Sequence, residues 1–199
     1  MNAPTNPRSS RGYFGIGVEG VSKPLNVGSL VRSAHAFGAS FVFTLAAAYT
    51  ADAGRADTSD ALGQLPFYRF DSVESMHLPE GCALVGIELL DTAVDLPSFR
   101  HPRCAAYVLG AERASLSPAL SECLDHVVRI PTRFALNLAV ACAIVMYDRM
   151  LSMRRFAERP LIPGGRTELP PLPAFGEPIW KKRLRRRAGA QNVSTRTTE

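Results

Sequence analysis

Short apolar runs alternate with turn residues along most of the chain, and this pattern sets the first expectation for its fold. Runs that are rich in β-branched and aromatic residues and bounded by Gly, Pro or Ser are typical of buried parallel strands. The predicted strands are Tyr13–Glu19, Ser40–Leu45, Phe67–Phe70, Cys82–Ile87, Ala105–Leu109 and His126–Ile130.

Two long helical segments accompany these runs. Pro24 breaks the chain, and a helix is predicted from about Leu25 to Phe37, where Gly38 suits the position just past a helix end. A second helix is predicted from about Leu136 to Met153, because apolar residues recur there at helical spacing. The residues of this stripe are Leu138, Ala141, Cys142, Val145 and Met146.

Shorter elements complete the pattern. A short helix is predicted near Ser72 to Met76, and another begins with Ser117 as N-cap and Pro118 as its first residue and runs to about Leu124. Residues 50–63 are polar and are expected to form a loop. The alternation of strands and helices predicts an α/β fold, a parallel sheet with helices on both faces.

Charge divides the chain into a near-neutral body and a basic end. Residues 1–153 carry 12 Lys and Arg against 14 Asp and Glu, a net of −2, whereas residues 154–199 carry 11 against 4, a net of +7. A basic end is the usual electrostatic footprint of a polyanionic partner, and the same composition also suits a solvated tail. We expect a disordered leader at 1–11, a domain at 12–155, and a Pro-rich, basic C-terminal extension at 156–199.

Composition also limits the compartment and the chemistry. The N-terminus has no apolar segment of a secretory signal, and no run reaches the roughly 18 apolar residues that a membrane helix needs. The four cysteines and four histidines are scattered and lack the spacing of metal ligands. We therefore expect a cytoplasmic protein with free thiols, no membrane partner and no metal.

Three polar motifs lie at strand ends or helix starts. Asn26-x-Gly28-x-x-x-Arg32 opens the first long helix, LGAERASLS (residues 109–117) follows a strand, and IPTRFALNLAVA (residues 130–141) joins the last strand to the last helix. Each motif alone is a weak signal, because an Asn at a helix start is usually a cap and a lone helical Arg usually extends into solvent. Their combination in this order is more specific.

Together the motifs resemble those of the SpoU (TrmH-like) family of the SPOUT RNA methyltransferases: N-x-G-x-x-x-R, G-x-E-x-x-G, and I-P followed by S-L-N. The resemblance covers roughly residues 12–153. It implies a C-terminal trefoil knot, a feature almost absent from other proteins. It also implies S-adenosylmethionine as cofactor, methyl transfer to the ribose 2′-hydroxyl of RNA, and a homodimer with sites near the subunit interface. Transfer RNA is the first expected substrate and ribosomal RNA the second.

The resemblance assigns candidate site residues. The expected cofactor-binding residues are Ile87, Gly110, Ile130 and Leu136. The expected catalytic residues are Asn26, Arg32, Glu112 and Asn137. Structural alternatives remain open for these positions: a turn at Gly110, core packing at Ile130 and Leu136, and helix-end caps at Glu112 and Asn137.

The family proposal gives the motif arginine, here Arg32, the task of activating the ribose hydroxyl. A guanidinium stays protonated, with a pKa above about 12, and has no acceptor atom. A simpler hypothesis is that Arg32 grips the neighbouring RNA phosphate and lowers the cost of forming the alkoxide, while the proton leaves to that phosphate or to water. Glu112 is then expected to orient backbone or Asn26.

The sequence departs from the family pattern at three points. Ala135 stands where the third motif has serine, Ser115 stands where the second motif has its second glycine, and only five residues lie between Pro131 and Asn137. Three alternatives to the methyltransferase hypothesis therefore stay open. They are a divergent RNA-binding protein of the same fold without activity, a base methyltransferase of another SPOUT branch, and a generic flavodoxin-like domain.

Overall fold

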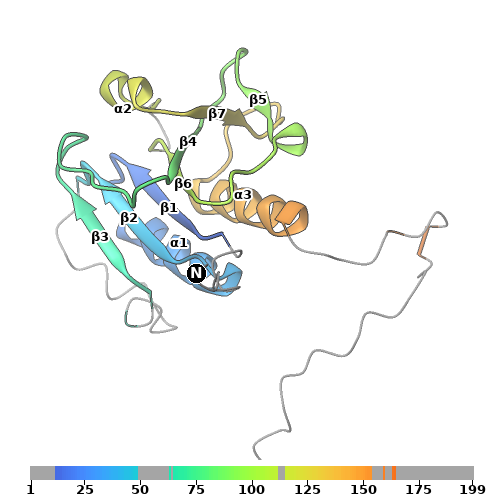
Figure 1. Ribbon diagram of the computed structural model, residues 1–199, viewed down its shortest axis with the longest axis horizontal. Coiled ribbons are helices and arrows are strands. Elements are labelled where there is room, and N and C mark those ends of the chain that lie inside the picture. Colours follow the sequence, from blue (N-terminus) through green and yellow to red (C-terminus); the bar gives the residue numbers. More distant parts are fainter. Residues whose placement is uncertain are drawn as a thin grey trace, which may run out of the picture. The chain divides into compact units, whose positions relative to one another are not determined.

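The fold is described from a computed structural model, which covers residues 12–48, 63, 65–111, 115–153, 159, 163 and 164 of the 199-residue chain (Figure 1). The predicted leader at 1–11 lies outside the described residues. So does the loop at 50–63 apart from Gly63, and the C-terminal extension apart from Arg159, Pro163 and Gly164.

A single parallel sheet organises the described part of the chain. Its strands are β1 (Phe14–Glu19), β2 (Phe41–Leu45), β3 (Phe67–Phe70), β4 (Ala83–Ile87), β5 (Val94–Asp95), β6 (Ala105–Leu109) and β7 (His126–Arg129). They lie in the order β3-β2-β1-β6-β4-β7-β5, and every neighbouring pair runs parallel. The predicted strands and the parallel α/β sheet are confirmed.

Helices α1 (Pro24–Phe37), α2 (Pro118–Glu122) and α3 (Leu138–Met153) connect or follow the strands. Pro24 is the first residue of α1, where a missing N–H costs nothing, so the helix begins one residue before the predicted Leu25. Gly38 ends α1 in the left-handed conformation, with φ 78°. Ser117 caps α2 as predicted, because its Oγ accepts the backbone N–H of Leu120 at 3.2 Å.

Two local predictions need correction. Residues 72–76 form hydrogen-bonded turns and not a helix: the N–H of Ser75 donates to the carbonyl of Ser72, and Ser75 Oγ donates to the same oxygen. These short-range bonds compete with helical ones. The region 94–98 contains β5 and a 3-10 turn, η4 (Leu96–Ser98), which were not predicted. A two-residue strand is too short for an alternation pattern to reveal.

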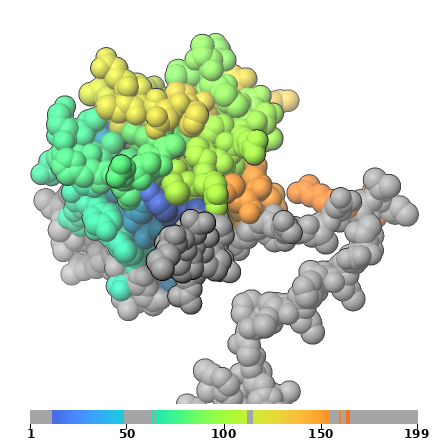
Figure 2. All heavy atoms as spheres, viewed as in Figure 1, coloured from blue at the N-terminus to red at the C-terminus, as the bar shows by residue number. Residues whose placement is uncertain are grey.

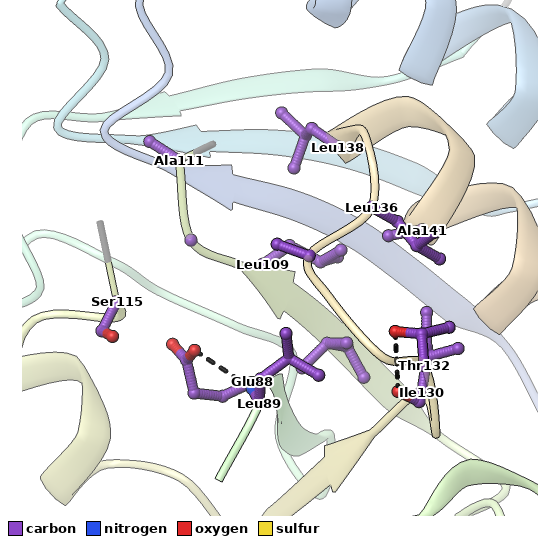
Figure 3. A pocket seen from close by; sticks show the side chains of 13 residues that line it. Glu88, Leu89, Leu109, Ala111, Ser115, Ile130, Thr132, Leu136, Leu138 and Ala141 are labelled. Atoms are coloured by element: carbon purple, nitrogen blue, oxygen red, sulfur yellow. Dashed lines mark hydrogen bonds between the residues drawn. The ribbon is translucent and has the colours of Figure 1, made fainter. Parts of the chain in front are cut away.

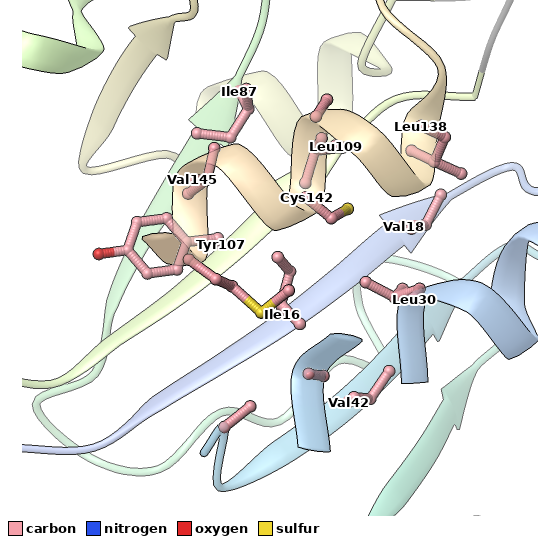
Figure 4. Close-up of a cluster of buried hydrophobic side chains, with 14 of the residues drawn as sticks. Ile16, Val18, Leu30, Val42, Ile87, Tyr107, Leu109, Leu138, Cys142 and Val145 are labelled. Carbon is pink, nitrogen blue, oxygen red and sulfur yellow. The ribbon is translucent and has the colours of Figure 1, made fainter. Parts of the chain in front are cut away.

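The larger hydrophobic core lies between one face of the sheet and the paired helices α1 and α3 (Figure 4). Ile16, Tyr107 and Val42 point into it from three strands, and Leu30 and Val145 meet them from the helices. All of the predicted apolar stripe of α3 is buried. Alternate residues of each strand therefore face α1 and α3, as the period of two along a strand requires.

A second core covers the opposite face of the sheet. Leu120 of α2 packs there with aromatic residues of β2, and the segment after β3 closes the same cluster, so that α2 and this segment share one face (Figure 2). Side chains of Phe41 and Phe43 lie over Gly15 and Gly17 of β1, where a Cβ atom would overlap the rings. Helices thus cover both faces, as predicted.

One buried arginine near the C-terminal end of α3 is hydrogen-bonded to the segments that lead into β1 and β6. The Arg149 guanidinium donates to the carbonyl oxygens of Pro102 at 2.6 Å and Arg103 at 2.8 Å, and to that of Tyr13 at 3.3 Å. It also donates to the hydroxyl of Tyr107 at 2.9 Å and lies 5.2 Å from the ring centre of Phe14. These bonds satisfy a charge that would otherwise be costly to bury.

The same network contains a buried histidine. His101 Nε2 lies 2.9 Å from Asp148 Oδ2, and its Nδ1 lies 2.6 Å from the Tyr107 hydroxyl. Because an ionised carboxylate only accepts, Nε2 carries the proton and the Tyr107 O–H donates to Nδ1. Burial lowers the pKa of His101 from its ordinary 6.5, so the ring is held neutral.

The cysteines are free thiols in different surroundings. Cys142 is buried in the core, and burial raises the pKa of its thiol, which keeps it protonated. Cys82 and Cys104 are half-buried, whereas Cys123 is exposed at the end of α2. Among the described residues, no helix has the length and apolar character needed to cross a bilayer.

Candidate functional site

A pocket opens at the carboxyl edge of the sheet, where β4, β6 and β7 end and α3 begins (Figure 3). Its volume is about 290 Å³. Ligands of open parallel α/β sheets characteristically bind beyond the carboxyl ends of the strands. The described residues that line it are Ile87, Glu88, Leu89, Leu109, Gly110, Ala111, Ser115, Ile130, Thr132, Ala135, Leu136, Leu138 and Ala141.

All of the residues predicted to bind the cofactor line this one pocket. Ile87 ends β4, Gly110 follows β6, Ile130 follows β7, and Leu136 precedes α3. They come from separate segments of the chain, and the parallel order of the strands brings these segments to the same edge. The alternative of core packing applies in part, because Ile130 is also buried in the larger core and half-buried Leu136 packs against it.

The loop after β7 is shaped by Thr132. Its backbone N–H donates to the carbonyl of Ile130 at 2.7 Å, and its hydroxyl lies 3.0 Å from the carbonyl of Phe134 and 3.3 Å from that of Ile130. These bonds fold residues 130–134 into a tight turn. The turn keeps Ile130 and Thr132 on the pocket while Phe134 is exposed.

Sequence reasoning missed most of the remaining wall. Ala111, Leu138 and Ala141 supply small or apolar surface, and Ala135 and Ser115 lie at two positions that depart from the family pattern. Ser115 does not adopt a positive φ, since Ala46 is the non-glycine residue with a positive φ among those described. Serine can therefore stand here in place of the family's glycine without backbone strain.

Of the described residues that line the pocket, Glu88 is the one with a charged side chain. Its Oε1 accepts the backbone N–H of Leu89 at 3.1 Å and its Oε2 accepts that of Leu116 at 2.9 Å. Glu19, at the end of β1, accepts the N–H of Ser117 at 2.8 Å. A usable signal was present in the sequence, because Glu88 directly follows the buried strand that carries Ile87.

The predicted catalytic residues that the structure describes do not line the pocket together with the predicted cofactor-binding residues. Asn26 is half-buried in the first turn of α1, and Arg32 is exposed on the same helix; neither is among the described residues that line the pocket. Asn137 caps α3, since its Oδ1 accepts the N–H of Ala139 at 3.0 Å and of Val140 at 3.4 Å. Glu112 lies outside the described residues.

The part of the chain that the structure describes holds no candidate metal site. There, no three His, Cys, Asp or Glu side chains come together in a group that could hold a metal ion.

The comparison with known families gives a direct result. Residues 14–147 match the sequence profile of the SpoU rRNA Methylase family. The chain belongs to this family. The match runs from β1 into α3, so it includes each segment that lines the pocket.

Two curated SpoU relatives act on different RNAs. The 23S rRNA (guanosine-2′-O-)-methyltransferase RlmB of Coxiella burnetii is 32% identical over 143 residues, which cover 66% of this chain and 55% of that protein. The mouse tRNA (guanosine(18)-2′-O)-methyltransferase TARBP1 is 27% identical over 137 residues, which cover 64% of this chain and 9% of that protein. The chain thus spans about half of one relative and less than a tenth of the other.

Solved structures of SpoU methyltransferases share the fold. AviRb from Streptomyces viridochromogenes, in complex with the cofactor AdoMet, is 28% identical with a TM-score of 0.64, over 72% of this chain and 60% of that chain. The AdoMet-bound rRNA methyltransferase from Sinorhizobium meliloti has a TM-score of 0.65 at 24% identity, over 73% of this chain and 59% of that chain, and this likeness concerns the fold alone.

Proposed function

We propose that this chain is an S-adenosylmethionine-dependent RNA methyltransferase that methylates a ribose 2′-hydroxyl. The observation that carries the proposal is the meeting of Ile87, Gly110, Ile130 and Leu136 in one pocket. The motif resemblance, which rests on the sequence alone, assigns the same residues to the cofactor. Membership of the SpoU family and the activities named for RlmB and TARBP1 support the same reaction.

The pocket fits such a cofactor. Ile87, Ile130 and Leu136 offer apolar surface for the adenine ring, and Gly110 leaves its backbone open to polar contacts. The volume of about 290 Å³ lies just below the range of roughly 300–1,000 Å³ typical of small-molecule sites. When bound, S-adenosylmethionine supplies a methyl group on a sulfonium centre that is already activated toward a nucleophile.

The protein then has two tasks, to align the ribose hydroxyl and to ease the loss of its proton. Arg32 is our choice for the second task. Its permanently charged guanidinium would hold the adjacent phosphate and favour the developing alkoxide, while the hydroxyl proton leaves to that phosphate or to water. Asn26, at the start of the same helix, would help to position α1 or the ribose, and Glu112 would orient the backbone near it.

Arg32 is exposed and is not among the described residues on the pocket wall, so we propose that the active form is a homodimer in which the two sites lie near the subunit interface. Exposed apolar side chains support this. Val140 and Tyr147 lie two turns apart on α3 and are 49% and 48% exposed, and Leu25 of α1 is 67% exposed. Light scattering of the purified chain, compared with Tyr147→Asp, tests this arrangement.

Further parts of the proposal follow from the same resemblance. We propose transfer RNA as the substrate, with ribosomal RNA as the alternative that RlmB supports. We also propose a trefoil knot in the C-terminal part of a domain at 12–155, a basic extension that attracts RNA phosphates, and a cytoplasmic location.

Blocking the pocket tests the link between this cavity and methyl transfer. Ala141 lines the cavity from α3, so Ala141→Phe would place a ring in the cofactor space. We expect the wild-type chain to transfer labelled methyl groups from S-adenosylmethionine to RNA, and Ala141→Phe to lose both transfer and binding of S-adenosylhomocysteine. Ser152→Phe is the control, because it adds the same ring at an exposed position at the other end of α3. Full transfer by Ala141→Phe would place the reaction elsewhere.

A further inference from the structure

Two carboxylates hold the segment that leads from the second motif into α2. Glu19 comes from the end of β1, and Glu88 directly follows β4. They accept the backbone N–H groups of consecutive residues, Ser117 at 2.8 Å and Leu116 at 2.9 Å. This segment is therefore fixed to two separate strands at the carboxyl edge of the sheet.

Glu88 does more than hold one residue. Oε2 bonds to Leu116, next to Ser115, and Oε1 bonds to Leu89. Ser115 and Leu89 both line the pocket, and Figure 3 shows the carboxylate of Glu88 between its own strand end and Ser115. One side chain thus bridges two walls of the cavity.

We propose that Glu88 is a positioning residue of the cofactor site, which sets the width of the pocket by joining the wall at Leu89 to the wall at Ser115. Glu19 supports it by holding the next residue, Ser117. This inference rests on the proposed use of the pocket for S-adenosylmethionine. Nothing in the family motifs assigns a role to either carboxylate.

The chemistry of the bridge requires two acceptor oxygens. An ionised carboxylate has two, and each here receives one backbone N–H. The side-chain amide of glutamine has the same size and shape but one acceptor oxygen. Its NH₂ group would face either the N–H of Leu89 or that of Leu116, so one of the two walls would lose its bond and be repelled.

The test is Glu88→Gln, with binding of S-adenosylhomocysteine measured by calorimetry in the absence of RNA. We expect the dissociation constant to rise at least about tenfold, since a displaced wall loses many contacts with the ligand. Glu122→Gln is the matched control, because it removes the same charge from an exposed position on α2. It should bind within about twofold of the wild type.

Amide exchange in the wild-type protein gives a readout that does not depend on the stability of the variant. In the wild-type protein the Leu116 amide should exchange slowly, because its hydrogen is bonded to Glu88 and the residue is buried. In Glu88→Gln that amide or the Leu89 amide should exchange faster. A fast-exchanging Leu116 amide in the wild type would refute the bridge directly.

The outcomes separate this inference from the proposed function. Equal binding by wild type and Glu88→Gln, with unchanged exchange, would contradict the role of Glu88 alone. A wild-type chain that binds no S-adenosylhomocysteine would contradict the proposed function itself. A tenfold loss of affinity in Glu88→Gln with normal Glu122→Gln would support both.

Discussion

Arg149 occupies a position that helical periodicity assigns to the apolar stripe of α3, three to four residues after Val145 and Met146, and it is 4% exposed. Periodicity predicts that such a position faces inward, but it cannot say that an arginine there will find carbonyl acceptors. Those acceptors come from Tyr13, Pro102 and Arg103, which are far away in sequence.

Replacement of Arg149 by lysine should therefore be costly although it keeps the charge. An ammonium cannot reach the carbonyls of Pro102 and Arg103 and the Tyr107 hydroxyl together as the planar guanidinium does. We expect Arg149→Lys to lower the free energy of unfolding by about 2–4 kcal/mol in urea titrations. The exposed Arg100→Lys should change it by less than about 0.5 kcal/mol, and equal effects of the two would show that the network adds nothing.

Arg32 differs from Arg149, because its proposed importance comes from a sequence motif and not from contacts within the fold. It is exposed on α1, and the fold does not require it. Arg32→Lys should lower methyl transfer to RNA about 100-fold or more, because lysine loses the bidentate grip on phosphate. Binding of S-adenosylhomocysteine should stay within about twofold, and the melting temperature should not move. Transfer at the wild-type rate would remove Arg32 from the mechanism.

At the scale of elements, the strands and long helices were predictable because each carries its own period or cap. Exceptions have local causes: Ser72 and Ser75 favour a turn through their side chains, and β5 is too short to show alternation. The pocket was only partly predictable. The motifs marked residues such as Gly110 and Leu136. The place of Glu88 after a buried strand was visible in the sequence, but its bonds to the backbone N–H groups of Leu89 and Leu116 were not.

The contact between β1 and β2 gives a test at this scale. Gly17 leaves room for the ring of Phe43, and a Cβ atom there would overlap it. Gly17→Ala should destabilise the protein by about 1–3 kcal/mol, as overpacking of a core does. The cost should shrink when the same change is made in a Phe43→Leu background, measured as a double-mutant cycle by chemical unfolding. An unchanged cost would mean that the ring is not the obstacle.

For the whole molecule, the buried His101 makes stability depend on pH. Burial lowers its pKa, and the groups that face the ring are Asp148 and Arg149 of α3 and Tyr107 of β6. On acidification the unfolded chain therefore binds a proton at this histidine at a higher pH than the folded chain does. The contribution of His101 is therefore complete above pH 6.5 and is lost as the pH falls below that value toward the lowered pKa.

We expect the unfolding free energy of the wild type to fall more steeply than that of His101→Gln between about pH 7 and pH 5. Both proteins share every other titrating group, so the difference between their profiles isolates this histidine. Parallel profiles would contradict a neutral, buried ring.

The family relationship, the pocket and the motif residues join in one claim, that the molecule methylates RNA on ribose. The most direct measurement incubates the purified chain with RNA and S-adenosylmethionine carrying a deuterated methyl group. The RNA is then digested to nucleosides, and mass spectrometry identifies the labelled ones. We predict the label on ribose, as 2′-O-methylated nucleosides from transfer RNA. Label on a base, or no label in transfer or ribosomal RNA at a protein concentration that binds the cofactor, would contradict the account.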